Sequence, residues 1–151
     1  METEKIKQSI SDLFAGADER NWQKVQSVMA NTVLLDYTSM VGGDPATLTP
    51  QQIAGAWAAF LPGFDKTYHQ LSAFEVNVNG ATATAHYSGK ADHFIGNETW
   101  TVEGTYDTEL QKEDDEWRVT KHKLNFTAHS GNTNLPAKAT EIINARNQQN
   151  H

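Results

Sequence analysis

The sequence predicts an α+β domain in which helices near the N-terminus lie inside a cone-shaped, curved antiparallel or mixed sheet. Apolar residues recur at helical spacing in the first third of the chain, whereas the rest alternates between apolar and polar residues over long runs. In the last run the alternation slips by one residue, which indicates a β-bulge and a bend in the sheet. The 151 residues fit one domain, 1–151, and the mouth of such a cone is a natural ligand pocket.

Three helices are expected before the long strands. Residues 3–19 form the first, and its apolar face consists of Ile6, Ile10, Leu13, Phe14 and Ala17. Residues 21–29 form a second helix with Asn21 as its N-cap. Residues 49–61 begin with TPQQ, a capping-box pattern with proline at the first helical position.

Five strands are expected, at 32–39, 67–78, 81–94, 98–111 and 117–128. Residues 40–48 contain Gly-Gly and Asp-Pro, so we expect a loop there. Pro136 is expected to begin a short C-terminal helix that carries Ile142 and Ile143. Because the sheet must be covered on one face, we expect the N-terminal helices to provide that cover.

Composition and charge exclude several function classes. The chain has no cysteine, so disulfides, thiolate metal sites and cysteine nucleophiles are excluded. The formal net charge is −7 and no cluster of Lys and Arg occurs, so we expect no nucleic-acid partner. The sequence has no signal-peptide pattern and no apolar run of about 20 residues, so we expect a cytoplasmic protein without a membrane partner. The histidine spacings match no metal motif, and we expect no metal.

Asp18 and Tyr37 are the first candidates for polar groups in the pocket. Asp18 lies four residues after Phe14 and continues the apolar face of the first helix, although a surface carboxylate near the helix end is the alternative. Tyr37 shares its strand face with Val33 and Leu35. A core tyrosine with a satisfied hydroxyl is the commoner interpretation, and a hydroxyl that faces the pocket is the functional one.

Two histidines lie on strands that line the expected pocket. His93 follows mainly alanine and glycine at the inward positions of residues 81–94, so small neighbours leave a cavity beside it. His69 shares its parity with Leu71, but the opposite parity holds Phe74, so its face stays open. The other histidines, which show no such pattern, are expected at the surface: His86, His122, His129 and His151.

The sequence resembles a known family. The segments ADERNWQKVQSVMANTVLLDY, TYHQLSAFEV, WTVEGTY, DEWRV and HSGN are similar, in their order and spacing, to those of a SnoaL-like domain over about residues 5–135. That group belongs to the nuclear transport factor 2-like superfamily, and the resemblance implies its cone-shaped fold. It also implies a homodimer or homotrimer and a small-molecule substrate or ligand.

Within that superfamily the site residues resemble those of scytalone dehydratase, which removes water from a hydroxylated ring without metal or organic cofactor. The resemblance implies catalytic roles for Asp18, His93, His69 and Tyr37. A second tyrosine of that enzyme is replaced by Ala17, and its serine and asparagine on a later strand by Gly104 and Tyr106. The substrate therefore stays open. The aromatic residues expected to contact substrate are Trp57, Tyr87, Tyr106 and Phe126.

The predicted mechanism is acid–base elimination. His69 would remove a proton α to a carbonyl, Tyr37 would polarise that carbonyl, and Asp18 would orient His93 by a hydrogen bond. A ketosteroid-isomerase-like site would use Asp36 as base, but Asp36 has the parity opposite to Tyr37. The other open alternatives are a non-catalytic binding module for small apolar ligands and an oligomerisation domain.

Overall fold

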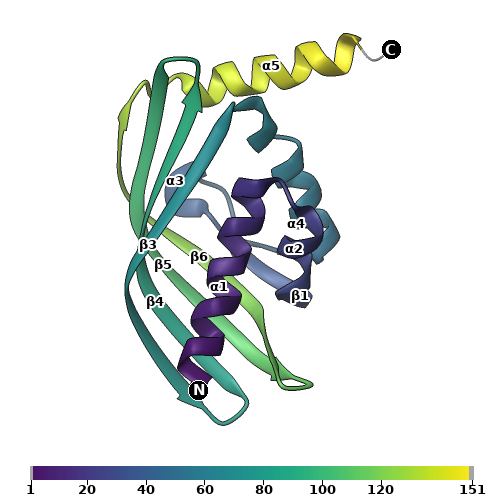
Figure 1. Cartoon of the computed structure of the whole chain (residues 1–151), viewed down its shortest axis with the longest axis vertical. Coiled ribbons are helices and arrows are strands. Elements are labelled where there is room, and N and C mark those ends of the chain that lie inside the picture. Colours follow the sequence, from purple (N-terminus) through teal and green to yellow (C-terminus); the bar gives the residue numbers. More distant parts are fainter. Residues whose placement is uncertain (1, 150–151) are drawn as a thin grey trace.

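A strongly curved six-stranded sheet forms one wall of the structure, a computed structural model that describes residues 2–149. The strand order is β2-β1-β6-β5-β4-β3, in which only β1 and β6 are parallel, so the sheet is mixed. Figure 1 shows α1, α2 and α4 on the concave side of the sheet. The predicted cone of sheet around N-terminal helices is confirmed.

The helices and strands follow one another in the order α1 Glu2–Glu19, α2 Trp22–Ser27, β1 Met29–Asp36, α3 Thr38–Val41, β2 Ala46–Leu48, α4 Pro50–Ala58, the 3-10 turn η1 Leu61–Gly63, β3 Lys66–Asn79, β4 Thr82–Ile95, β5 Glu98–Glu113, β6 Glu116–Gly131 and α5 Leu135–Gln149. The predicted caps are present, because Asn21 caps α2 and Thr49 with Gln52 forms the capping box of α4. Within residues 2–149 no helix is both long and apolar enough to cross a membrane.

The expected loop at 40–48 and the expected length of the C-terminal helix are wrong. The segment 40–48 is not all loop, because α3 extends into it as far as Val41 and β2 pairs with β1 inside it. The C-terminal helix is not short, and it buries Leu135 and Ala139 completely, whereas Ile142 and Ile143 are only half-buried. In Figure 1, α5 lies across the end of the long strands that is opposite to the N-terminus of α1. The N-terminal helices are therefore not the only cover of the sheet.

Bulges bend the sheet, as the slip in the alternation predicted. Thr120 and Thr127 of β6 are each skipped in the pairing with β5, so Val119 before the first bulge and Leu124 after it both face the core. A further irregularity lies in β3, where Ala73 has a φ of +58°. This bulge turns His69 and Phe74, which have opposite parity, toward the same side of the sheet.

Candidate active site

A cavity of about 240 Å³ lies between the helices and the concave face of the sheet. Its lining is largely apolar and consists of Phe14, Ala17, Tyr37, Met40, Val41, Trp57, Phe60, Leu61, His69, Ala91, His93, Trp100, Val102, Tyr106 and Leu124. The polar groups in this wall come from Tyr37, His69, His93, Tyr106 and the indole of Trp100. The indole N–H donates a hydrogen bond to Nδ1 of His129. Few polar groups in an apolar cavity are typical of a small-molecule site.

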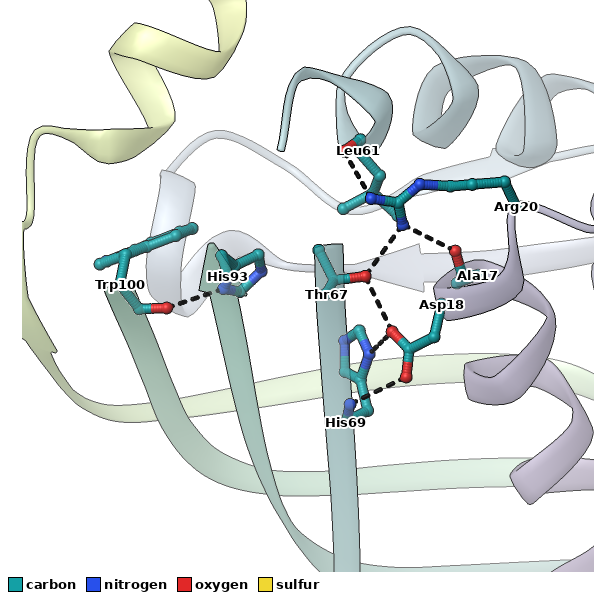
Figure 2. Close-up of polar contacts among 8 residues, drawn as sticks. All are labelled: Ala17, Asp18, Arg20, Leu61, Thr67, His69, His93 and Trp100. Carbon is teal, nitrogen blue, oxygen red and sulfur yellow. Dashed lines mark hydrogen bonds and ion pairs between the residues drawn. The ribbon is translucent and has the colours of Figure 1, made fainter. Parts of the chain in front are cut away.

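Asp18 and His69 form a close pair at the edge of the cavity. The carboxylate Oδ1 of Asp18 lies 2.6 Å from Nδ1 of His69, and its Oδ2 accepts the backbone N–H of His69 at 2.8 Å (Figure 2). Because a carboxylate accepts, Nδ1 of His69 carries a proton, and in the neutral imidazole the lone pair therefore lies on Nε2. His69 also lines the cavity, so it is a base that its carboxylate partner holds in one tautomer.

The predicted hydrogen bond from Asp18 to His93 is wrong. Nδ1 of His93 instead donates to the backbone carbonyl of Trp100 at 3.1 Å. The edge strand β3 packs against α1, so the end of α1 delivers Asp18 to His69 on β3, whereas His93 lies one strand farther away on β4. Periodicity placed His93 on the inner face and left the face of His69 open, and it carried no information about which histidine the helix end would reach.

His93 nevertheless belongs to the same cavity as His69. The two imidazole rings lie 6.3 Å apart between centroids and meet edge to face. Burial, only partly offset by the hydrogen bond to Trp100, lowers the pKa of His93 to about 4. His93 is therefore neutral near pH 7, with Nδ1 donating to the backbone and Nε2 free to accept a hydrogen bond from a ligand.

Asp18 stays ionised although it is half-buried. Burial opposes its charge, but the hydrogen bonds from His69 and Thr67 outweigh that effect and lower the pKa of Asp18. The hydroxyl of Thr67 donates to Oδ1 of Asp18 at 2.9 Å, and Thr67 is 2 % exposed. The carboxylate thus accepts three hydrogen bonds, which fix its orientation toward His69.

Arg20 ends the helix that carries Asp18. The backbone N–H of Arg20 donates to the carbonyl of Ala17, and the backbone N–H of Asn21 donates to the carbonyl of Gly16. These two hydrogen bonds are the pattern of a Schellman cap. Glycine is the usual residue at this position, because left-handed backbone costs other residues about 1–2 kcal/mol. Arg20 adopts it with a φ of +60°. Neither Arg20 nor Thr67 was predicted as a site residue, because neither continues an apolar face that parity could reveal.

Tyr37 and Tyr106 contribute two hydroxyl groups to the cavity wall. Neither hydroxyl has a hydrogen-bond partner among residues 2–149, and neither is a fully enclosed atom. Burial raises the pKa of Tyr37 well above its ordinary value. Burial and the charge of Asp18 raise the pKa of Tyr106 to about 12. Both groups are therefore protonated donors near pH 7 that a ligand oxygen can use.

The ring of Tyr106 is held rigidly by its neighbours. It stacks on His122 and Tyr87 with centroid distances of 5.2 and 5.4 Å, and it meets Phe14 edge to face. A Cβ at Gly89 would lie 2.3 Å from Cε2 of Tyr106, so only glycine lets the ring lie over β4. The small residues of β4 thus do not simply leave space, because Tyr106 fills part of it.

We expect Gly89→Ala to destabilise the protein by about 1–3 kcal/mol, because the added methyl group overpacks the site of the Tyr106 ring. Urea denaturation measures the free energy of unfolding. The matched control is Gly55→Ala in α4, where a Cβ would meet nothing within 4 Å and alanine should stabilise the helix by about 0.5–1 kcal/mol. Equal stability of Gly89→Ala and the wild type would contradict the close approach of Tyr106.

The other residues expected to contact substrate divide into two groups. Trp57 lines the cavity together with Tyr106. Tyr87 and Phe126 do not line it, because Tyr87 is fully buried with its hydroxyl bonded to Thr108, and Phe126 packs against a second core cluster, which contains Phe64 and Trp100. Tyr87 supports the site from behind, through its stacking on Tyr106.

His122, expected at the surface, is one of the most buried side chains of the protein. It is 1 % exposed, its Nδ1 lies 3.1 Å from the hydroxyl of Thr108, and its Nε2 has no partner in the described part of the chain. Burial lowers its pKa to about 3, so it is neutral near pH 7. His122 has the same parity as Leu124 after the bulge at Thr120, and this signal could have placed it inside. His86 and His129 are exposed as expected, and His151 lies outside the described residues.

Asp36 does not face the cavity. Its Oδ1 accepts the backbone N–H of Thr38 at 3.0 Å and the hydroxyl of Thr38 at 2.6 Å, so its carboxylate is bonded to the first residue of α3. The isomerase-like alternative with Asp36 as base therefore has no geometric support, and Tyr37 is the residue of this segment that lines the cavity. Within residues 2–149 no group of three or more metal-ligating side chains gathers in one place.

The sequence and the fold are similar to those of known proteins. A family model for the SnoaL-like domain matches residues 2–123, and no curated protein matches the sequence. The Kfla4162 protein from Kribbella flavida superposes with a TM-score of 0.84 at 24 % identity, over 89 % of this chain and 96 % of that chain. A candidate scytalone dehydratase from Novosphingobium aromaticivorans superposes with a TM-score of 0.76 at 17 % identity, over 85 % and 86 %. The type 2 hexachlorocyclohexane dehydrochlorinase LinA superposes with a TM-score of 0.73 at 16 % identity, over 86 % and 88 %. At these identities the likeness shows the fold alone.

Proposed function

The chain belongs to the SnoaL-like domain family, and on that premise we propose that it is a lyase that eliminates water from a small cyclic hydroxy-ketone without a cofactor. The observation that carries the proposal is the hydrogen bond of 2.6 Å between Asp18 and His69 at the wall of an apolar cavity. Two similar structures, named for a dehydratase and a dehydrochlorinase, support an elimination as the reaction class.

His69 is the general base in this proposal. Nε2 of His69 takes the proton from the carbon next to the carbonyl, and the electron pair of that C–H bond forms the enolate. Asp18 keeps the proton of His69 on Nδ1 and stabilises the imidazolium that forms, as a carboxylate does behind a catalytic histidine. The enolate then expels the hydroxyl group on the next carbon, a C=C bond forms, and His69 returns its proton to that oxygen as water.

Tyr37 and Tyr106 stabilise the enolate. Their hydroxyl groups line the cavity without protein partners, so they can donate to a carbonyl oxygen as negative charge develops on it. His93 takes a role different from the predicted one. Its neutral Nε2 accepts a hydrogen bond from a substrate hydroxyl and so orients the ring, whereas a pKa of about 4 leaves almost no protonated His93 to act as an acid near pH 7.

The size and chemistry of the cavity narrow the substrate. A volume of about 240 Å³ admits a compound of one or two fused rings rather than a long chain. Trp57, Phe60 and Trp100 supply flat apolar surface, which suits a planar or partly unsaturated ring. The cavity wall has few groups that can bind polar atoms of a substrate, so we expect the substrate to carry one carbonyl and one or two hydroxyl groups.

The test is turnover of a panel of cyclic β-hydroxy-ketones in D₂O, followed by NMR. We expect the wild-type protein to form the unsaturated ketone, and to place deuterium on the carbon next to the carbonyl each time that the enolate returns to substrate before the hydroxyl leaves. Tyr106→Phe should lower kcat about 10–100-fold, because one of two hydrogen bonds to the enolate oxygen is lost. Tyr87→Phe is the matched control, since its hydroxyl bonds to Thr108 outside the cavity, and it should retain nearly full activity.

Binding of these ketones without product or deuterium exchange would refute the lyase and favour the non-catalytic binding module. The same binding module would bind ligand equally well after the loss of His69, because an apolar cavity needs no base to hold a ring. Equal kcat for Tyr106→Phe and Tyr87→Phe would keep the elimination but remove Tyr106 from the mechanism.

A further inference from the structure

The side chain of Arg20 explains why arginine stands at a position that favours glycine. Nη1 of Arg20 donates to the carbonyl of Ala17 and to the hydroxyl of Thr67, each at 2.9 Å. Nη2 donates to the carbonyl of Leu61 at 2.9 Å. One guanidinium thus connects the end of α1, the turn η1 and the start of β3 (Figure 2). Backbone strain of this kind persists where the surrounding contacts hold it, and such positions cluster at functional sites.

The contact between Arg20 and Thr67 sets the direction of a hydrogen-bond chain. A guanidinium can only donate, so the hydroxyl oxygen of Thr67 must accept from Arg20. The single proton of that hydroxyl is then directed to Oδ1 of Asp18, 2.9 Å away. The chain therefore runs in one direction, from Arg20 through Thr67 to Asp18, and the ionised carboxylate at its end accepts from Nδ1 of His69.

We propose that Arg20 and Thr67 are positioning residues, which hold Asp18 ionised and directed at His69 so that the lone pair of Nε2 faces the cavity. The effect of this positioning on turnover rests on the proposed function, whereas the hydrogen-bond chain is a property of the free protein. The charge of Arg20 acts in the same sense, because it and the carboxylate of Asp18 stabilise each other across the short distance that Thr67 spans.

The alternative is that Arg20 only clamps the end of α1. The two roles make different predictions for Arg20→Gly. Glycine relieves the left-handed backbone, so the helix cap should be retained and the protein should fold. A clamp without a positioning role would leave the titration of Asp18 and the tautomer of His69 unchanged. A positioning role would alter both in a folded protein.

The experiment is NMR on the full chain labelled with ¹³C and ¹⁵N, without ligand. The ¹³C shift of the Asp18 carboxyl group gives its pKa, and the ¹⁵N shifts of His69 give the tautomer. We expect the wild type to hold His69 as the Nδ1–H form. In Arg20→Gly and Thr67→Val the pKa of Asp18 should rise toward its ordinary value, and His69 should become a mixture of tautomers. Thr67→Ser, which keeps the hydroxyl, should restore the wild-type behaviour.

Lys24→Met is the matched control for charge. It removes a cation near the end of α1 that pairs with Glu19 at 3.1 Å and contacts neither Thr67 nor Asp18. It should leave the pKa of Asp18 and the tautomer of His69 unchanged. Arg20→Lys keeps the cation but cannot bridge three acceptors from one planar group, so it should resemble Arg20→Gly in the tautomer of His69.

Turnover distinguishes this inference from the proposed function. With an active hydroxy-ketone we expect kcat to fall up to about 100-fold in Arg20→Gly and Thr67→Val with little change in KM, because only the base is misplaced. If the variants change the tautomer but even the wild type shows no turnover, the chain of contacts stands and the lyase is wrong. If folded Arg20→Gly and Thr67→Val leave Asp18 and His69 as in the wild type, the positioning role is refuted.

Discussion

Replacing His69 by glutamine is expected to lower kcat for the elimination by about 10²–10⁴-fold, the contribution typical of a positioned general base. This corresponds to about 3–5 kcal/mol in the activation free energy. Glutamine is similar in size and can still hydrogen-bond to Asp18, but it cannot take a proton from carbon near pH 7. Steady-state kinetics and deuterium exchange in D₂O measure the loss. KM should change little, because the apolar walls of the cavity remain.

The chain contains a matched control for this variant. His86 and Asp107 form a second pair with the same distance of 2.6 Å between Nδ1 and Oδ1. Their side chains are 47 % and 50 % exposed on the outer face of the sheet, whereas those of His69 and Asp18 are 13 % and 17 % exposed. His86→Gln should therefore leave kcat unchanged. A similar loss in both variants would show an effect of folding rather than of the base, and no loss in His69→Gln would refute the mechanism.

The contrast between these two pairs also shows which features of the site can be predicted from the sequence. The alternation in residues 81–94 placed His86 outside and His93 inside, and both placements agree with the structure. The period of 2 in a strand reports which face a side chain occupies, and the fold class follows from the same signal. The slip in β6 predicted a bulge that the pairing confirms at Thr120. These features depend on local periodicity, so one sequence is enough to predict them.

The partners within the site could not be predicted in this way. Whether Asp18 meets His69 or His93 depends on which strand lies beside the end of α1, and that depends on the order of strands across the sheet. Which face of the sheet His69 shares with Phe74 depends on the left-handed backbone conformation of Ala73, and the role of Arg20 depends on its own left-handed backbone conformation. The sequence does not reveal either conformation, because a left-handed backbone is expected at glycine and these residues are alanine and arginine. The dimer or trimer that the family resemblance implies stays a prediction.

Buried neutral histidines should make the protein unusually sensitive to acid. Burial lowers the pKa of His93 to about 4 and that of His122 to about 3, whereas both groups have a pKa of 6.5 in the unfolded chain. Between these values the unfolded chain binds more protons than the folded one, so stability falls as the pH falls. The positive charge of a protonated His69 would act in the same direction on both groups.

The expected loss of stability is large and its pH window is defined. The nearly two protons taken up on unfolding give a slope of about 2.5 kcal/mol per pH unit near pH 5, and a total of about 4.5 kcal/mol between pH 6.5 and 4.5. This is a large fraction of the stability of an ordinary domain. The carboxylates with a lowered pKa, such as Asp18, lose their contribution only below their unfolded values near pH 4. The change in stability above pH 4.5 therefore reflects protonation of the histidines.

Urea denaturation at several pH values tests this expectation, because the slope counts protons. In His122→Gln the amide can still bond to Thr108, but one proton is removed from the count, so the slope should fall by about half. His93→Gln should have the same effect, since glutamine can donate to the carbonyl of Trp100 in its place. His129→Gln, at an exposed position, should keep the full slope. A wild-type stability that is flat from pH 6.5 to 4.5 would mean that the folded protein admits both His93 and His122 in the protonated form, and His93 would then be a candidate proton donor rather than an acceptor.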